Sequence, residues 1–339
     1  MICFLTLSLL SGVIELGGIY LGITWDIPIH SIIVLPLFYQ VGNLLTSILP
    51  SKTSSSFAVI GTVCLLCGIY NWYPSFWILA VQLALCSYCI QIVRLQNKSV
   101  CATWLKRSFR IAGFALSPIM CLRDGQAVIL LSIMLCVFSL MKEVLFQEVR
   151  DESSLWKEHK PAKISMVMVF HQLHYFVYTY IIPIYIHQKT GSIAISALLF
   201  SLSWVIYLTP QTIAEKLHIV HYKMMFFCCH IFLGLCMAAI SISAYFDSMG
   251  MVLLFWLLTG FGGGSVFCIS HLYKRYASIN MDFSENIGHF LGPVIAIFLC
   301  HGADGNIFAI LPAVSCLFVM MTLLFALYII RKEGKHYEK

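Results

Sequence analysis

Long apolar stretches, separated by short polar segments, recur along the whole chain. A bilayer's hydrocarbon core is about 30 Å thick, and an α-helix needs about 20 apolar residues to cross it. Backbone N–H and C=O groups in lipid must pair within their own segment, so such stretches predict helices. We predict an all-α membrane protein with twelve transmembrane helices, near residues 2–23, 29–50, 56–72, 75–95, 105–122, 126–147, 164–186, 191–210, 222–246, 249–270, 284–301 and 305–330.

One markedly polar stretch lies inside the chain, KEVLFQEVRDESSLWKEHKPAK at residues 142–163. It falls between the sixth and seventh predicted helices, so each half holds six helices in the same orientation. We therefore predict an N-terminal six-helix bundle at 1–147, a cytoplasmic linker at 148–163, and a C-terminal six-helix bundle with a short cytoplasmic tail at 164–339. This arrangement indicates a parallel duplication, which makes the two bundles pseudo-symmetric.

The basic residues concentrate in alternate loops. If both termini are cytoplasmic, all basic residues except Arg123 and Lys189 fall in cytoplasmic segments, and Arg110 is counted among them. Cytoplasmic loops of membrane proteins carry an excess of Lys and Arg, so the pattern supports both the helix count and cytoplasmic termini. We expect a multi-pass protein of the plasma membrane, or bacterial inner membrane. The net charge of +6 is then a topology signal, and no nucleic-acid partner is expected.

The composition also indicates a membrane protein without a metal or cofactor site. The chain is 60% hydrophobic and 11% charged, and its mean hydropathy is +0.88, whereas soluble domains carry about 25% charged residues. The pairs CLLC at 64–67 and CSYC at 86–89 lie inside apolar helices, where buried cysteines favour packing over metal or redox chemistry. The sequence has no Walker loop, G-x-G-x-x-G or H-E-x-x-H, so we predict no cofactor and no metal.

An internal match supports the duplication. RIAGFALSPIM at 110–120 aligns with ENIGHFLGPVI at 285–295, which pairs Gly113 with Gly288, Ser117 with Gly292, and Pro118 with Pro293. Each segment places small residues on one face and ends in a proline, a pattern that permits close helix contact and a bend. Both segments occupy the fifth helix of their half.

With twelve helices, cytoplasmic termini, two six-helix halves, a charged central loop and these Gly-Pro elements, the chain resembles the major facilitator superfamily of secondary transporters. The resemblance covers nearly the whole chain and is architectural. It implies that the first and seventh helices line a central cavity. It also implies alternating access of a small-molecule solute, driven by H⁺ or Na⁺, and we expect the chain to act as a monomer.

Glu15 is the sharpest candidate for chemistry, because an ionisable group inside a membrane helix is costly and by default functional. It shares a helical face with small and polar residues, Ser8, Ser11, Gly12 and Gly18. A carboxyl group there can bind and release a proton as the cavity alternates between wet and closed. The alternative is a neutral Glu that hydrogen-bonds a neighbouring helix for structure alone.

The segment FHQLHYFVYTYIIPIYIHQ carries the second candidate group. His171, His174, Tyr178 and Tyr185 recur at helical spacing, so one side of a single helix would present them. The resemblance places this helix opposite the first, so we expect the imidazoles to face Glu15 and to serve as a proton relay or solute contact. The alternative is that neighbouring carbonyls satisfy the histidines and that the tyrosines are interfacial.

Weaker candidates follow the same logic. Solute or coupling roles are predicted for Gln40 and Asn43 on the second helix, Trp256 on the tenth, and Asn286 and His289 on the eleventh. Gating or close helix packing is predicted for the remaining set, Gly113, Pro118, Gly288, Gly292, Pro293 and Gly263.

Two other functional classes remain open at this stage. A membrane-embedded transferase acting on an acyl or lipid-linked substrate would use His and Glu as acid and base, and it predicts polar residues clustered at one membrane face. A transport-inactive relic or receptor with the same fold is the second. The mid-depth position of the candidate residues favours the transporter, so we do not expect an enzyme.

Overall fold

The structure, a computed structural model, describes residues 2–49, 61–62, 75–96, 103–121, 163–216, 222–263, 268–269, 280–302 and 306–337. Its elements are helices: α1 (Ile2–Thr24), α2 (Ile29–Ile32), α3 (Val34–Ile48), α5 (Phe76–Gln96), α6 (Thr103–Leu116), η1 (Ser117–Cys121), α8 (Met166–Phe176), α9 (Ile181–Thr190), α10 (Ile193–Lys216), α11 (Tyr222–Tyr245), α12 (Met249–Thr259), η4 (Gly260–Gly263), α14 (Met281–Gly302) and α15 (Ile307–Tyr337). The fold is therefore all-helical, as the apolar pattern predicted.

Ten of the twelve predicted helices have a counterpart among the described residues. The other two, at 56–72 and 126–147, fall outside them except for residues 61 and 62, as does the predicted linker up to residue 162. The count of twelve is thus not confirmed. Within the residues that the structure describes, five segments are long and apolar enough to cross a membrane: Leu5–Thr24, Ile29–Ile48, Tyr222–Tyr245, Met281–Gly302 and Ile307–Arg331.

The predicted seventh helix is broken in the middle. α8 ends at Phe176, residues 177–180 form a turn, and α9 begins at Ile181. Pro183 explains the break, because a proline ring clashes with the carbonyl four residues earlier, here that of Thr179. The helix predicted to present His171, Tyr178 and Tyr185 together is therefore interrupted, because Tyr178 lies in the turn and Tyr185 lies in a separate helix.

Glycines bring helix backbones into contact at matching places. A Cβ on Gly12 would lie 2.1 Å from the carbonyl oxygen of Arg110, and one on Gly113 would lie 2.1 Å from that of Leu9, so α1 and α6 touch there. On α14, a Cβ on Gly288 would lie 2.6 Å from the carbonyl oxygen of Val169 in α8. Small residues permit such approaches in membrane bundles, where packing holds helices together.

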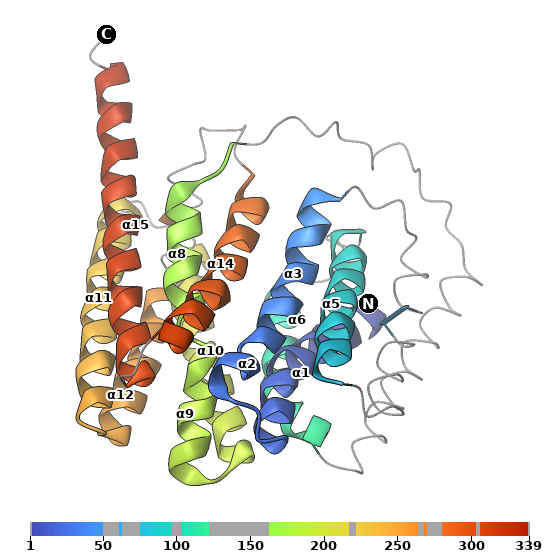
Figure 1. Cartoon of the computed structure of the whole chain (residues 1–339). Coiled ribbons are helices and arrows are strands. Elements are labelled where there is room, and N and C mark those ends of the chain that lie inside the picture. Colours follow the sequence, from blue (N-terminus) through green and yellow to red (C-terminus); the bar gives the residue numbers. More distant parts are fainter. Residues whose placement is uncertain are drawn as a thin grey trace, which may run out of the picture.

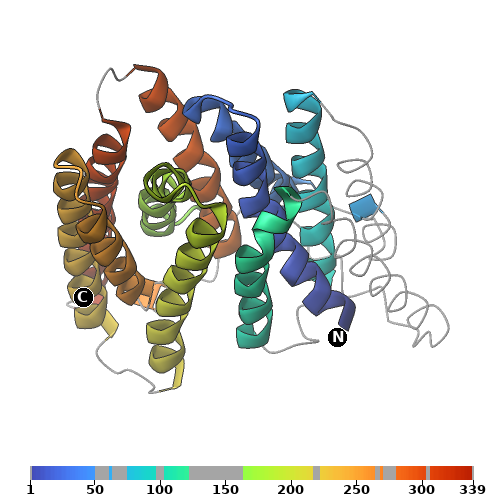
Figure 2. The ribbon, with the colours of Figure 1, turned by 90° about the horizontal axis from the view of Figure 1, so that it is seen from below.

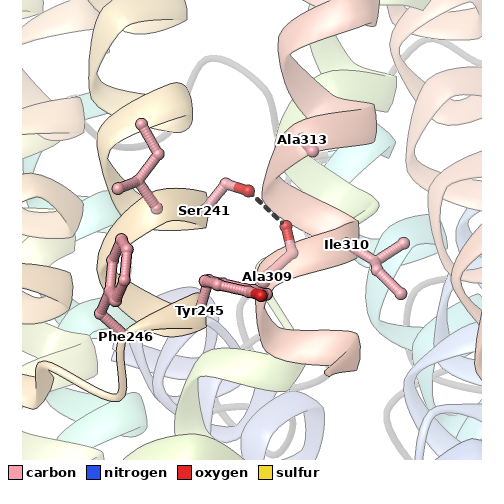
Figure 3. A pocket seen from close by; sticks show the side chains of 7 residues that line it. Ser241, Tyr245, Phe246, Ala309, Ile310 and Ala313 are labelled. Carbon is pink, nitrogen blue, oxygen red and sulfur yellow. Dashed lines mark hydrogen bonds between the residues drawn. The ribbon is translucent and has the colours of Figure 1, made fainter. Parts of the chain in front are cut away.

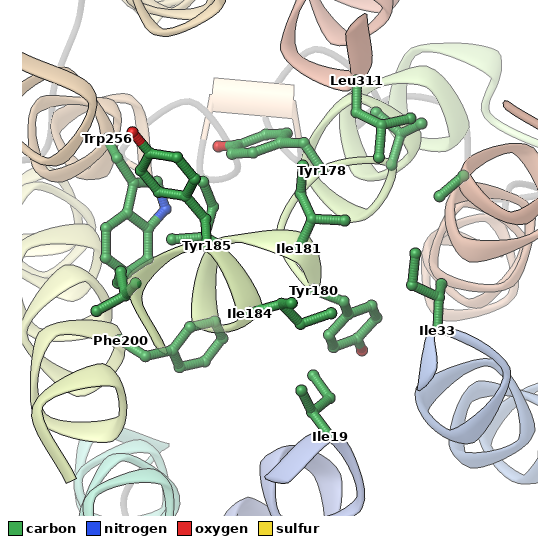
Figure 4. Packing of buried hydrophobic residues seen from close by; sticks show 14 of the residues in the cluster. Ile19, Ile33, Tyr178, Tyr180, Ile181, Ile184, Tyr185, Phe200, Trp256 and Leu311 are labelled. Atoms are coloured by element: carbon green, nitrogen blue, oxygen red, sulfur yellow. The ribbon is translucent and has the colours of Figure 1, made fainter. Parts of the chain in front are cut away.

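Figures 1 and 2 show two groups of helices side by side, α1 to α6 in blue to teal and α8 to α15 in green to red. Contacts between the groups run from α3 to α14, from α6 to α10, and from α1 to α9. A buried cluster extends across this boundary and includes Ile19 and Ile33 from one group with Tyr180, Ile184 and Phe200 from the other (Figure 4). The boundary is thus a packed interface that α1 and the α8–α9 turn both reach.

Candidate functional site

Glu15 forms an ion pair with Arg110. An Arg110 Nη2 atom donates to Glu15 Oε2 at 2.5 Å, which joins α1 to α6. The Glu15 side chain is 4% exposed and that of Arg110 is 24% exposed. The backbone contact between Gly12 and Arg110, one helical turn before Glu15, brings the two side chains within reach.

The second carboxylate oxygen of Glu15 is held from the other group of helices. Tyr180, in the turn between α8 and α9, donates its hydroxyl to Glu15 Oε1 at 3.0 Å. Gln40 Nε2 donates to the Tyr180 hydroxyl oxygen at 2.6 Å and lies 3.4 Å from Glu15 Oε1. Both carboxylate oxygens thus have donors, and the proline-induced turn places one of those donors.

Asn43 continues this network into α5. Its Nδ2 donates to Gln40 Oε1 at 2.7 Å, and its Oδ1 accepts from Ser87 Oγ at 2.6 Å and Gln91 Nε2 at 2.9 Å. Asn286 of α14 donates to Ser47 Oγ at 2.6 Å and to the Asn43 carbonyl oxygen at 3.4 Å. The predicted residues Gln40, Asn43 and Asn286 therefore lie on one polar path that links α1, α3, α5 and α14.

Aromatic rings surround the Arg110 guanidinium. Its Cζ lies 5.6 Å from the Phe114 ring centre and 5.5 Å from that of Trp204 on α10. The Trp204 ring centre is 5.9 Å from that of Tyr175 and 5.4 Å from that of Tyr207. Cations are attracted to ring faces at such distances. Arg110 thus has a carboxylate on one side and an aromatic wall on another.

His289 lies on α14 near this region but belongs to a second polar group. Its Nε2 is 3.1 Å from Gln172 Oε1 and 3.6 Å from Glu285 Oε1. Its ring centre lies 4.1 Å from that of Phe176. Glu285 and His289 interact electrostatically with Arg110. Both side chains therefore lie within electrostatic range of the ion pair.

The histidines of α8 face α11 and α15. His171 Nδ1 lies 3.0 Å from His230 Nε2, and His230 Nδ1 lies 2.9 Å from the carbonyl oxygen of Phe226. A carbonyl only accepts, so His230 carries its proton on Nδ1 and His171 donates to His230 Nε2. This hydrogen bond corrects the expectation that His171 faces Glu15, because the His171 imidazole points to His230 of α11.

His174 is buried beside this pair, 2% exposed, with its ring centre 5.0 Å from that of His171. Neither of its ring nitrogens has a hydrogen-bond partner among the described residues, and Ser315 of α15 donates to its backbone carbonyl. The structure thus groups three imidazoles in one region and the Glu15 network in another, with Tyr180 as the α8–α9 residue that reaches Glu15.

The remaining predicted residues have packing contacts. Tyr178 is fully buried, and Figure 4 shows it on the other side of Ile181 from Tyr180. Trp256 is fully buried in the same cluster and its carbonyl accepts from Thr259. The predicted gating set lies at helix contacts and transitions: Pro118 in η1, Pro293 inside α14, Gly292 against Phe176, and Gly263 at the end of η4.

Sequence reasoning missed Arg110, Tyr180, Trp204 and His230 as site residues. The signal for Arg110 was present, because it lies one helical turn before Gly113 and so shares the face that packs on α1. It was counted as a cytoplasmic loop charge instead. Tyr180 had no such signal, since its direction depends on the turn before Pro183.

Among the described residues, no group of three or more His, Cys, Asp or Glu side chains is arranged to hold a metal ion. An apolar groove opens between α11 and α15, lined by Ile242, Tyr245, Phe246 and Ile310, where Ser241 donates to the Ala309 carbonyl at 2.7 Å (Figure 3). Its lining offers no charged group.

No protein-family model and no curated protein sequence matches the chain. Solved structures do match it over nearly its whole length. The nucleoside transporter NupG aligns with a TM-score of 0.67 at 13% identity, over 97% of this chain and 96% of that one. A bacterial homologue of the iron transporter ferroportin aligns with a TM-score of 0.61 at 14% identity, over 97% and 98%. The E. coli fucose–proton symporter aligns with a TM-score of 0.57 at 13% identity, over 96% and 97%. The chain therefore shares its overall helical fold with these transporter structures.

Proposed function

We propose that the chain is a secondary transporter that moves a small organic solute across a membrane by alternating access. The observation that carries this proposal is the Glu15–Arg110 pair, a nearly buried ion pair that touches both groups of helices through Tyr180. Its support from the fold is that the three matched structures are all transporters. The plasma membrane, cytoplasmic termini and a monomeric state belong to the same proposal.

The two groups of helices are proposed to rock against each other as pseudo-symmetric bundles. Their contacts support this, because α3 meets α14 and α6 meets α10. α3 and α6 are the second and fifth predicted helices of the first half, and α10 and α14 are the second and fifth of the second half. Each group thus contributes the same two helices to the boundary. The glycine contacts support it as well: α6 packs on α1 through Gly113, and α14 packs on α8 through Gly288. A rotation that exchanges the two groups would place the α3–α14 contact on the α6–α10 contact, and the α1–α6 contact on the α8–α14 contact.

The proposed coupling ion is H⁺, and Glu15 is its binding site. Both Glu15 oxygens accept hydrogen bonds from N–H or O–H donors. A Na⁺ ion would have to displace those donors to gain oxygen ligands, because a sodium site needs several oxygen atoms. A proton instead needs only Glu15 Oε2, the oxygen that accepts a hydrogen bond from Arg110. Protonation there would release Arg110 and loosen the α1–α6 contact.

An uptake screen tests this function. Cells producing the protein, and cells producing Glu15→Gln, are incubated with a metabolite mixture at an inward proton gradient, and intracellular solutes are compared by mass spectrometry. We expect at least one solute that the wild type accumulates and that a protonophore prevents from accumulating, and Glu15→Gln should not accumulate it. Full, gradient-dependent accumulation by Glu15→Gln would remove Glu15 as the coupling residue.

The transferase alternative has less support in the structure. It needs acid and base groups together at one membrane face, whereas Glu15 lies in the interior of α1, beyond its midpoint and about nine residues before its end. His171 and His174, the predicted acid and base partners, lie apart from Glu15 against α11 and α15. A solute that is accumulated unchanged would exclude the transferase.

A further inference from the structure

Arg110 has more hydrogen-bond donors than its partner uses. A guanidinium carries five N–H groups, and Nε–H together with one terminal N–H forms a fork that matches a carboxylate. Glu15 Oε2 accepts from Nη2, while Arg110 Nε is buried with no partner among the described residues. The fork is thus half used, because Glu15 Oε1 is held instead by Tyr180.

A second unused donor lies beside the first. The indole Nε1 of Trp204 is also buried with no partner among the described residues, and the Trp204 ring lies 5.5 Å from Arg110 Cζ. Arginine and indole N–H groups can only donate, so the missing partner must be an acceptor. Because Arg110 is 24% exposed while Glu15 is 4% exposed, a molecule approaching the pair meets the cation first.

The rings around Arg110 favour a particular shape of ligand. The ring centres of Phe114, Tyr175 and Tyr207 each lie 5.4 to 5.9 Å from that of Trp204. Phe114 is buried, whereas the other three rings are partly exposed. A flat apolar body packs well against such a wall, because offset or edge contacts between rings are favourable at these separations. An acceptor group on that body would lie where the donors of Arg110 and Trp204 point.

The charges nearby limit the ligand to one negative charge. The titratable groups that interact with Arg110 from α1, α3, the α8–α9 segment and α14 are Glu15, Tyr39, Tyr175, Tyr180, Glu285 and His289. Arg107 of α6 also interacts with Glu285 and with Tyr207, so the charges of Arg107 and Glu285 offset each other. When Glu15 is protonated, the site is therefore left with one net positive charge, that of Arg110. A monoanion matches this charge, whereas a dianion such as a phosphate monoester would leave the site with a net negative charge.

We propose, building on the transport function above, that the solute is an organic monoanion, a carboxylate on a flat apolar body, and that it replaces Glu15 on Arg110 when Glu15 takes up a proton. One proton goes onto Glu15 and one carboxylate goes onto Arg110, so the net charge of the site does not change. Solute and proton then bind cooperatively, because each favours the state in which the Glu15–Arg110 pair is broken. The transport cycle is an electroneutral symport.

Binding to the purified protein tests the substrate class without any gradient. Equilibrium dialysis in detergent compares benzoate, nicotinate and indole-3-acetate with the three corresponding amides between pH 6 and pH 8, where these carboxylates are ionised throughout. We expect at least one carboxylate to bind and its amide not to bind. Its affinity should rise as pH falls, by up to about tenfold per pH unit, because one proton is taken up with each anion.

Two variants separate the parts of the proposal. Glu15→Gln removes the competing charge but keeps the side-chain shape, so it should bind the carboxylate at pH 8 at least as tightly as the wild type does at pH 6, with no dependence on the titration of residue 15. The double variant Glu15→Gln with Arg110→Gln removes both charges of the pair, which avoids an unpaired buried ion. It should fold and bind neither carboxylate nor amide.

Several results would overturn the substrate assignment. These are equal binding of amide and carboxylate, no carboxylate binding by either the wild type or Glu15→Gln, binding that survives in the double variant, and pH dependence that persists in Glu15→Gln. Each would leave the transport function standing if the uptake screen finds a proton-driven solute of another class. Conversely, anion binding without any gradient-driven uptake would contradict the transport function and would leave the anion-binding site supported.

Discussion

The contact between α1 and α6 at Gly12 sets the geometry of the ion pair, and Gly12→Ala perturbs it directly. The new Cβ would lie 2.1 Å from the Arg110 carbonyl oxygen, whereas a carbon and a carbonyl oxygen in contact lie about 3.3 Å apart. The helices must therefore separate by about 1.2 Å. If α6 moves as a unit, the 2.5 Å contact from Arg110 to Glu15 lengthens to about 3.7 Å, beyond hydrogen-bond range.

We expect Gly12→Ala to lower stability by about 1–3 kcal/mol, at the upper end because the clash involves backbone on both sides. Thermal unfolding in detergent measures this loss, and proton-driven uptake should fall with it. Gly18→Ala is the matched control on the same helix, because its Cβ would meet Leu83 Cδ1 at 3.1 Å, the end of a flexible side chain. Equal melting temperatures for Gly12→Ala and Gly18→Ala would refute the reasoning.

Three further outcomes follow from the polar contacts. Arg110→Gln should lower stability by about 3–5 kcal/mol because it leaves a buried carboxylate unpaired, and adding Glu15→Gln should restore most of that loss. A double variant as unstable as Arg110→Gln would contradict this. Asn43→Ala should cost about 1–2 kcal/mol, since it removes the hydrogen bonds between α3 and α5, and an unchanged unfolding midpoint would argue against that network. His230→Leu should cost about 1–3 kcal/mol because His171 loses its acceptor, and thermal unfolding indistinguishable from wild type would mean that this donor finds another partner.

The sequence predicted the helical class and most helix positions because apolar length is a strong signal in a membrane protein. α1, α11 and α14 each lie within three residues of their predicted ends. The glycine pattern also pointed to the contacts that Gly113 and Gly288 make, since small residues at helical spacing define a packing face.

Side-chain direction was harder to predict, and the seventh predicted helix shows why. Helical spacing places residues on one face only while the helix continues, and the turn before Pro183 ends that regularity. Tyr180, in that turn, reaches Glu15, whereas His171, within α8, points to His230 of α11. Arg110 was misplaced for a different reason, because the positive-inside rule counts charges near helix ends without regard to the face they occupy.

The most direct test of the central claim is solute accumulation in proteoliposomes under an imposed pH gradient, with the solute identified by the uptake screen. The wild type should concentrate the solute above its external level while the gradient lasts and should release it when a protonophore is added. Glu15→Gln should exchange the solute across the membrane but should not concentrate it. If Glu15→Gln concentrates the solute as the wild type does, Glu15 does not couple the proton to transport.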